Sequence, residues 1–475
     1  MRRTGSVKLS VGRPADLWAS FTKVRVILSR HALPLGVVVL GCLISQATIL
    51  TRSPLIVTNP DSPLYAALGQ RLAEHPSLLN LFDPLRTPGY PAFLALLDIL
   101  GIHGFMVVYG QAALLVIAGL EVYILAQGLA GSRVAGAIAG LLVGANLLLI
   151  DWERALLSES LAFLAVTTTA LCFWLWLRHR GVGWALAFST SSLLGIMTRP
   201  SLLFLPLCLA AFVVIGDRRR WLAGVAVIVG VYLTVAGYGA VNNYLYPQSG
   251  LSTSSSYNLL GKIEEYRMEN EGDAARYPTL WQEANNVSAA DPNPSKTLYN
   301  ELLAQPEVRG ANWENAGQFS RAIVLRHPLE YIIKSGGDLM VVWQVQPYTF
   351  APVVFGSALD AQVGAIELSL SHFAYEAYPL MPLTILLLIL AWRRIESQAA
   401  LGIAALGVSV LGGILVTATL GFDDFARLRA PVDSLAMVVT IALAARLWQA
   451  VVGVNAGRAA TKVAKPGLPG APPLI

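Results

Sequence analysis

Two short polar stretches follow the first long apolar run, and their residue types could carry out group transfer. The first reads NPDSPLY and contains Asp61 and Tyr65; the second reads RTPGYP and contains Arg86 and Tyr90. A carboxylate can accept the proton of an attacking hydroxyl as a general base. A guanidinium offers a planar fork of donors that suits a phosphate. Asp61 is therefore the candidate base and Arg86 the candidate phosphate ligand, with the two tyrosines as candidates for the substrate pocket.

Both charged residues also have a purely structural interpretation. Ser62, followed by proline, is a good N-cap for a helix over residues 63–74, so Asp61 would lie just ahead of a positive helix end. Leucines recur on one face of this helix, which is typical of a helix lying along a membrane interface. Arg86 begins a second apolar helix over residues 92–100, where a cation often extends to the membrane surface. The sequence leaves both interpretations open.

A third polar stretch, IDWERALLSES, holds three carboxylates between apolar runs. Glu159 is expected one turn inside the next helix, where an unpaired ionisable group costs about 2.5–3.5 kcal/mol or more. It is therefore a second candidate catalytic carboxylate, the alternative being a charge that answers the helix dipole. Asp151 and Glu153 are candidates for the substrate pocket, and solvated surface charge is the simpler interpretation of both.

Arginines near later apolar runs complete the candidate site. Arg199 lies in MTRPSLLFLP, and Arg427 and Arg429 lie in GFDDFARLRAP. These three arginines are candidates for binding the phosphate of an anionic lipid. The alternative for Arg427 and Arg429 is internal pairing with Asp423 and Asp424.

Composition places these stretches on a membrane protein. The chain of 475 residues is 55% hydrophobic and only 13% charged, whereas soluble domains carry about 25% charged residues. The six histidines are scattered and the three cysteines lie inside apolar runs. The sequence contains no P-loop, HExxH helix or CxxC pair, which excludes the usual soluble nucleotide and zinc sites. A divalent cation stays possible.

The apolar runs predict an all-α polytopic bundle of about ten transmembrane helices. The expected spans cover residues 33–50, 105–128, 132–150, 155–177, 182–198, 200–216, 220–241, 376–392, 398–420 and 431–450. With ten spans, every short cluster of Lys and Arg falls on one side, as the positive-inside rule requires. Both termini are then cytoplasmic, and the first outer loop, residues 51–104, is extracytoplasmic.

The remaining segments complete the expected domain organisation. They are a basic cytoplasmic arm (1–32), the membrane region 33–241, an extracytoplasmic subdomain (242–375) with helices at 257–270 and 313–333, the C-terminal helices (376–450) and a disordered cytoplasmic tail (451–475). Residues 336–356 are apolar enough to enter the membrane as well.

Six pieces of the chain together resemble the class C membrane glycosyltransferases, in particular bacterial relatives of the protein O-mannosyltransferases and the lipid A aminoarabinose transferase. The pieces are PDSPLY, RTPGYPAFLALL, ERALLSESLAFL, IMTRPSLLFLPL, RHPLEYI and FARLRAPVD, in that order. They cover most of the membrane part of the chain, while the 242–375 segment contributes RHPLEYI alone.

The resemblance implies an inverting enzyme of the inner or plasma membrane that uses a polyprenyl-phosphate-linked sugar on the extracytoplasmic face. Asp61 matches the catalytic aspartate of the family's first loop, and Arg86 matches the basic residue that holds the donor phosphate. Glu159 stands at a second acidic position, and Arg427 and Arg429 match late basic positions. Asp61 is followed by serine where the family commonly has an Asp-Glu pair, so metal use stays open.

Three matters are left open by the sequence. The sugar is undetermined, and the acceptor could be a protein, a lipid or a glycan. A transporter or lipid flippase without chemistry is the rival class, although the repeats and mid-membrane charges typical of transporters are not evident. A polymerase or ligase of surface glycans would share the same membrane fold.

Overall fold

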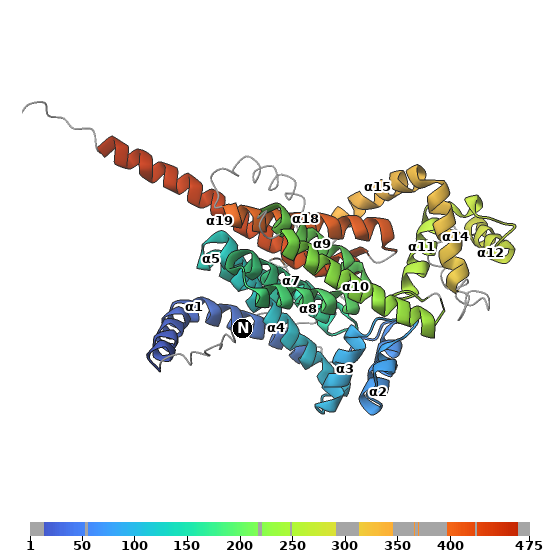
Figure 1. The fold of residues 1–475 in the computed structure, drawn as a ribbon, viewed down its shortest axis with the longest axis horizontal. Helices are drawn as coiled ribbons and strands as arrows, with labels where there is room; N and C mark the ends of the chain where they lie inside the picture. The colour runs from blue at the N-terminus through green and yellow to red at the C-terminus, as the bar shows by residue number, and fades with distance from the viewer. Residues whose placement is uncertain are drawn as a thin grey trace, which may run out of the picture.

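The computed structural model describes residues 14–52, 56–216, 221–247, 249–290, 313–344, 397–422 and 425–463, besides residues 365 and 369. Across these residues the regular structure is helical, with one isolated β-bridge (Figure 1). The expectation of an all-α chain is confirmed for this part of the protein.

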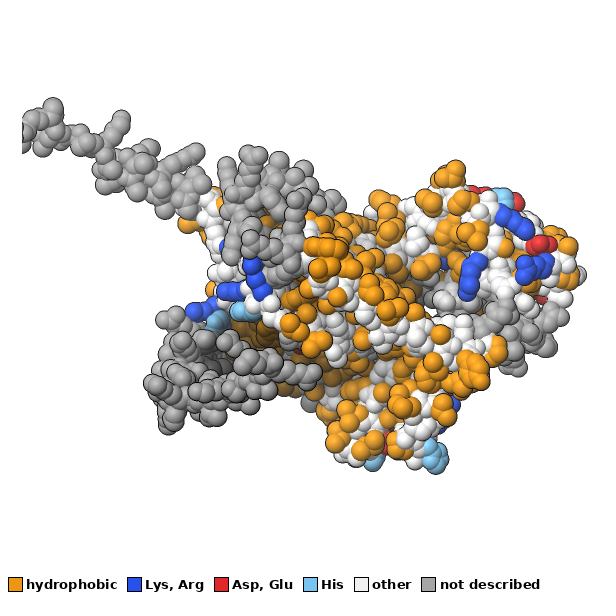
Figure 2. Space-filling view, in the orientation of Figure 1, with side chains coloured by type: hydrophobic (Ala, Val, Ile, Leu, Met, Phe, Trp, Pro, Cys, Tyr) orange, Lys and Arg blue, Asp and Glu red, His pale blue; other side chains and the backbone are white. Residues whose placement is uncertain are grey.

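Six helices among the described residues are long and apolar enough to cross a membrane, so the chain is a multi-pass membrane protein. The helices that contain these spans are α1 (Pro14–Arg52), α4 (Val107–Ala130), α7 (Glu159–His179), α10 (Trp221–Leu245), α18 (Ser397–Leu420) and α19 (Phe425–Val463). Hydrophobic side chains cover much of the surface over this bundle, as a lipid environment requires (Figure 2).

Three of the ten expected spans take another form. Residues 132–150 fold as α5 (Arg133–Gly144) and α6 (Leu147–Glu153), which are bent by 45° and would make a seventh span if they cross together. The bend falls at Asn146, whose side chain caps α6 by accepting from two backbone N–H groups. The other two are the shorter apolar helices α8 (Val182–Thr198) and α9 (Phe204–Gly216).

Several other boundaries lie outside the described residues or are shifted. The expected span at 376–392 is not among the described residues, so the count of ten remains a prediction. Helix α1 begins at Pro14 and therefore includes the second half of the expected arm. Helix α19 continues to Val463, so the first part of the tail expected to be disordered is helical.

Small residues let the central helices approach closely. A Cβ on Gly119 of α4 would lie 3.0 Å from the Cα of Gly144 in α5. Membrane helices commonly pack through such small-residue contacts. At the C-terminal end of α4, the Arg446 Nε donates to the Leu129 carbonyl at 2.7 Å, which attaches α19 to the last turn of α4.

The described residues 249–290 and 313–344 form a unit that we call the helical subdomain. It consists of α11 (Ser254–Glu265), α12 (Pro278–Ala290), α14 (Trp313–Arg326) and α15 (Pro328–Gln344), together with the short η5 (Glu269–Glu271). The helix expected over 257–270 starts earlier and ends at Glu265. The helix expected over 313–333 breaks at His327, because the following proline starts a new helix.

The helical subdomain has a small core and a buried carboxyl group. Tyr257, Ile263 and Phe319 are among its core residues. Burial, and then the neighbouring Glu269 carboxylate, raise the pKa of Glu264 to about 9, although a hydrogen bond from Ser288 acts to lower it. Glu264 is therefore neutral in the folded protein at pH 7.

Helices α2 (Ser62–Glu74) and α3 (Gly89–Ile99) pack against each other at the end of the bundle next to this subdomain (Figure 1). Helix α2 buries Tyr65, Leu68 and Leu72, whereas Leu64 is only half-buried. The expected apolar face is thus rotated toward Tyr65, because α2 packs on α3 instead of lying alone on the membrane surface.

Candidate functional site

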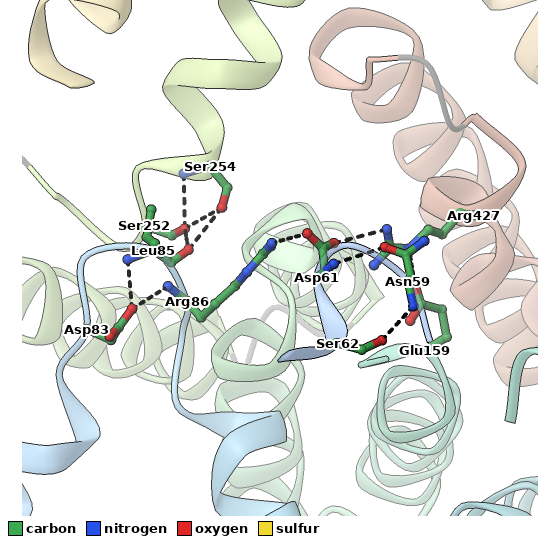
Figure 3. Close-up of polar contacts among 10 residues, drawn as sticks. All are labelled: Asn59, Asp61, Ser62, Asp83, Leu85, Arg86, Glu159, Ser252, Ser254 and Arg427. Carbon is green, nitrogen blue, oxygen red and sulfur yellow. Dashed lines mark hydrogen bonds and ion pairs between the residues drawn. The ribbon is translucent and has the colours of Figure 1, made fainter. Parts of the chain in front are cut away.

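A tight turn presents Asp61 at the first turn of α2. The Asp61 N–H donates to Asn59 Oδ1 at 3.1 Å, and the Asn59 N–H donates to Ser62 Oγ at 2.9 Å. Asp61 itself occupies the N-cap position, and its side chain makes no cap hydrogen bond. The expectation that Ser62 is the N-cap is therefore wrong by one residue. The Asp61 carboxylate is turned away from α2 and toward arginines (Figure 3).

A backbone bridge joins this first loop to the acidic turn of the third polar stretch. Val57 and Ala155 form a parallel β-bridge, with the Val57 N–H donating to the Arg154 carbonyl at 2.8 Å. Because residues 154–157 take part in this connection, α7 begins only at Glu159. Glu159 is therefore the first residue of its helix and does not lie one turn inside it, as the sequence suggested.

Arg86 reaches back across the site to Asp61. Its guanidinium forms an ion pair with Asp61 Oδ1 and lies 5.1 Å from the centre of the Tyr65 ring. The side chains of Arg86 and Asp61 are 21% and 27% exposed, so this pair remains accessible. A cation that simply extends toward the membrane surface would not be held between a carboxylate and an aromatic ring.

The loop that carries Arg86 is held from two sides (Figure 3). Asp83 Oδ1 accepts from the Leu85 N–H at 2.8 Å and from the Arg86 N–H at 3.1 Å. The hydroxyls of Ser252 and Ser254 both donate to the Leu85 carbonyl, at 2.6 and 2.9 Å. Sequence reasoning missed this role, because a serine-rich run such as the one around residue 252 is typical of any loop.

Gly89 brings the start of α3 against the end of α8. A Cβ at this position would lie 2.6 Å from both the Met197 carbonyl oxygen and Thr198 Oγ1. Only glycine permits that approach. The contact places the Arg86 loop beside the segment in which Arg199 follows α8.

Glu159 lies at the buried floor of the site. It is completely buried, and its Oε1 accepts from Arg427 Nε and from an Arg199 guanidinium nitrogen at 3.2 Å. Arg427 also reaches Asp61 Oδ2 at 3.2 Å. Arg427 therefore bridges the two candidate carboxylates, which come from the first loop and from the start of α7.

The site consists of three guanidiniums and two carboxylates in the described part of the chain. Asp61, Arg86 and Arg427 form its open edge, with side chains 27%, 21% and 14% exposed. Arg199 and Glu159 lie beneath that edge, at 8% and 0%. An apolar bundle that gathers five charges at one end can bind a charged ligand there, since charges near lipid are otherwise costly.

The two tyrosines form the wall between this site and the bundle. The rings of Tyr65 and Tyr90 meet edge to face, with centroids 5.0 Å apart. The Tyr90 hydroxyl donates to Gln111 Oε1 at 2.7 Å. Burial, and then the nearby Glu159 carboxylate and Tyr65, raise the pKa of Tyr90 well above its usual value. Tyr90 is therefore a neutral buried support, and Gln111 is a partner that the sequence did not indicate.

Three expected site residues lie elsewhere. Asp151 and Glu153 are buried instead of solvated, because α6 is folded into the bundle. Asp151 pairs with Arg154 at 2.7 Å, and Glu153 accepts from Gln46 Nε2 at 2.7 Å. Neither carboxylate belongs to the open edge.

Arg429 is the third residue that lies elsewhere. It is almost fully buried, pairs with Asp433 at 3.0 Å, and donates to the carbonyls of Val342 and Trp343 at the end of α15. It acts as a cationic cap on a helix C-terminus. The alternative partners Asp423 and Asp424 lie outside the described residues.

The side chains that could coordinate a metal ion are the last feature of the site. Both carboxylates at the site bind guanidiniums. Within the described ranges, no group of three or more His, Cys, Asp or Glu side chains is arranged to hold a metal ion.

Comparisons with known proteins give a likeness in structure but no match in sequence. No protein-family model matches the sequence, and no curated protein matches it. Among solved structures, the chain is similar to that of ArnT from Cupriavidus metallidurans, a crystal structure described as bound to undecaprenyl phosphate. The alignment covers 83% of this chain and 78% of that chain, with 16% identity and a TM-score of 0.32. At that level, the likeness by itself assigns no activity to this chain.

Proposed function

We propose that this protein is an inverting glycosyltransferase that moves a sugar from a polyprenyl-phosphate-linked donor to a hydroxyl acceptor. One observation carries the proposal. The Asp61 carboxylate lies between the guanidiniums of Arg86 and Arg427, at the open edge of an otherwise apolar bundle. This edge offers a base and phosphate ligands within one side chain's reach of each other.

The two arginines suit the leaving group. A lipid phosphate departs as a stable anion, so it needs cations that stabilise its charge and no general acid. Arg86 and Arg427 approach the carboxylate from opposite sides (Figure 3). When a donor phosphate occupies the edge, it competes with Asp61 for these guanidiniums and leaves the carboxylate able to act as a base.

The transfer step follows from this arrangement. The acceptor oxygen attacks the anomeric carbon and forms the new C–O bond, while the bond from that carbon to the phosphate oxygen breaks. The acceptor proton passes to the Asp61 carboxylate, and the lipid phosphate stays with the arginines. General-base catalysis of this kind is worth about 10²–10⁴-fold. Glu159 is too deeply buried to meet the acceptor and acts as a positioning residue for Arg199 and Arg427.

The positions of arginines along the membrane helices support an extracytoplasmic location of the site. Helix α7 starts at the site with Glu159 and has 21 residues, so its basic end at Arg178 and Arg180 lies about 30 Å away. Arg133 likewise starts α5 at the end where α4 finishes. By the positive-inside rule, these arginines mark the cytoplasmic side of the inner or plasma membrane.

Substitution of Asp61 by asparagine tests the proposed base. Asp61→Asn keeps the shape of the side chain but removes its basicity, so the protein should insert normally while transfer falls by about 10²-fold or more. The measurement is mass spectrometry of lipid-linked sugars and surface glycans in cells that carry each variant. We expect cells with Asp61→Asn to accumulate a polyprenyl-monophosphate sugar, as cells without the gene would.

Asp98→Asn is the matched control, because Asp98 lies on neighbouring α3 with its side chain 44% exposed and paired only with the exposed His103 among the contacts described. It should leave the glycan profile unchanged. Full transfer by Asp61→Asn would exclude Asp61 as the base. Accumulation of a diphosphate-linked oligosaccharide would instead indicate a glycan polymerase or ligase, and accumulation on the cytoplasmic face alone would indicate a flippase.

A further inference from the structure

Helix α15 of the helical subdomain has an unusual exposed side. Apart from the Glu330–Lys334 pair, whose side chains are 43% and 34% exposed, every exposed position from its first residue to Val341 is apolar or glycine. We call these positions, without the initial proline, the apolar stripe: Leu329, Ile332, Ile333, Gly336, Gly337, Met340 and Val341. The large side chains of the stripe are 50–75% exposed, and a Cβ on either glycine would meet nothing within 4 Å.

Asp338 and Ser335 lie on the other side of α15, toward α11. Asp338 pairs with the fully buried Lys262 of α11 and accepts from the Tyr266 hydroxyl. The Tyr266 hydroxyl also contacts Ser335 at 3.2 Å. Apart from the Glu330–Lys334 pair, the helix therefore turns its polar groups inward and exposes its hydrocarbon, which is the reverse of a helix that packs against a core and faces water.

Helix α12 of the same subdomain provides an internal comparison. Its exposed positions include Thr279, Gln282 and Asn286. That pattern is ordinary for a water-facing helix. Composition of the subdomain as a whole therefore does not explain the stripe, which is specific to α15.

The C-terminal half of α15 belongs to the membrane bundle. Val342 is part of the same buried cluster as the core of the spans, and Arg429 of α19 caps the carbonyls of Val342 and Trp343. The Tyr331 hydroxyl donates to the Thr419 carbonyl near the end of α18. Figure 1 shows α15 running from α14 toward α18, and Figure 2 shows hydrophobic side chains over this region.

We propose that the apolar stripe is a membrane-docking surface, immersed in the acyl chains of the leaflet on the side of the candidate site. Helix α15 packs against α18, a membrane span whose exposed apolar side chains include Leu411 and Leu415. At 17 residues, α15 is about 25 Å long. That length is short of the ~30 Å hydrocarbon core, so α15 enters one leaflet and does not cross.

This placement gives the subdomain an anchor that acts on the site. Lipid holds the outer side of α15, while its inner side holds α11 through Lys262 and Asp338. The first turn of α11 in turn holds the Leu85 carbonyl through Ser254, one residue before Arg86. The depth of α15 in the leaflet thereby sets the position of the Arg86 loop.

Collision accessibility of a nitroxide label on the stripe tests the proposal. Full-length protein with Cys42, Cys172 and Cys208 changed to alanine receives one new cysteine, at Ile333, and is reconstituted in liposomes of phosphatidylethanolamine and phosphatidylglycerol. Gln282→Cys on α12 is the water-facing control, and Leu415→Cys on α18 is the lipid-facing control. Relaxation by oxygen, which concentrates in lipid, is compared with relaxation by a water-soluble nickel chelate.

We expect the oxygen-to-nickel ratio at Ile333 to match that at Leu415 and to exceed that at Gln282 several-fold. A ratio like that of Gln282 would mean that the stripe faces water and would overturn the proposal. Shielding from both reagents would overturn it too, because residues 345–396 or a second copy of the chain would then cover the stripe. If the variant without native cysteines does not fold, Ile333→Cys and Gln282→Cys in the native background can be labelled with a polar maleimide. The proposal requires that only Gln282→Cys reacts above the background of the unmodified protein.

Discussion

The buried carboxylate of Glu159 predicts how substitutions in the site should change the free energy of unfolding. Glu159→Gln preserves the shape of the side chain and one acceptor oxygen, but it removes the charge that Arg199 and Arg427 share on a single oxygen. Those two guanidiniums, 8% and 14% exposed, would then face each other with only the neutral amide between them. Breaking a buried ion pair by removing one partner costs about 3–5 kcal/mol. We expect Glu159→Gln to lower the free energy of unfolding by that amount.

A second substitution should recover most of this loss. Arg199 has Glu159 as its ionic partner and a further contact of 3.4 Å to the Arg427 carbonyl. Adding Arg199→Met to Glu159→Gln removes the guanidinium that was left without a carboxylate, and neutral replacement of a whole buried pair is often nearly neutral for stability. The coupling in the double-mutant cycle should therefore be at least as large as the recovered stability, about 3 kcal/mol or more.

Chemical denaturation in mixed micelles measures the four proteins of this cycle. Glu330→Gln is the matched control, because Glu330 forms an exposed pair with Lys334 on α15, and exposed pairs contribute little. If Glu159→Gln lowered the free energy of unfolding as little as Glu330→Gln, the two buried arginines would not depend on the Glu159 charge. If the effects of Glu159→Gln and Arg199→Met were simply additive, the pairing on which the argument depends would be wrong.

Three further predictions concern the supports of the site. Arg429→Met should lower stability by about 3–5 kcal/mol because it removes the buried ion pair with Asp433, whereas donor KM should be unchanged in a membrane assay. A raised KM with unchanged unfolding would return Arg429 to the candidate phosphate ligands. Gly89→Ala should destabilise the protein by about 1–3 kcal/mol through overpacking against Met197, as measured by denaturation, and a neutral effect would contradict the close approach. Glu264 has a pKa of about 9 in the folded protein against 4.5 in the unfolded chain. The contribution of its neutral carboxyl to the free energy of unfolding is therefore fully present below pH 4.5 and is lost as the pH rises toward 9. Glu264→Gln should therefore raise stability at pH 7 by up to about 3 kcal/mol and flatten the decline between pH 5 and 8; an unchanged slope would refute the raised pKa.

The general character of the protein was accessible from the sequence, because it depends on local composition. A bilayer requires long apolar helices, and six of the expected spans coincide with helices that meet that requirement in the described residues. Residue type also marked candidates for the site, since charged groups between apolar runs are costly unless they are paired or functional; they are Asp61, Arg86, Glu159, Arg199 and Arg427. The proposed activity remains a hypothesis from those residue types and their geometry.

The sequence could not show which of these charged side chains contact one another. Asp151 and Glu153 lie in the same short stretch as Glu159, yet α6 carries both into the bundle while Glu159 starts the next helix beneath Asp61. Arg427 and Arg429 differ by two positions, which places them on different sides of α19. One bridges the two candidate carboxylates, and the other caps α15.

By itself, the sequence determined that this is a helical multi-pass membrane protein and which ionisable groups lie at the ends of its apolar runs. What only the tertiary structure decided was which of those groups meet. An ion pair needs its atoms within about 4 Å, and that proximity arises from contacts remote along the chain: the Val57–Ala155 bridge, the close approach at Gly89 and the serine clamp on Leu85. None of these contacts follows from helical periodicity, because each depends on how separate helices are docked.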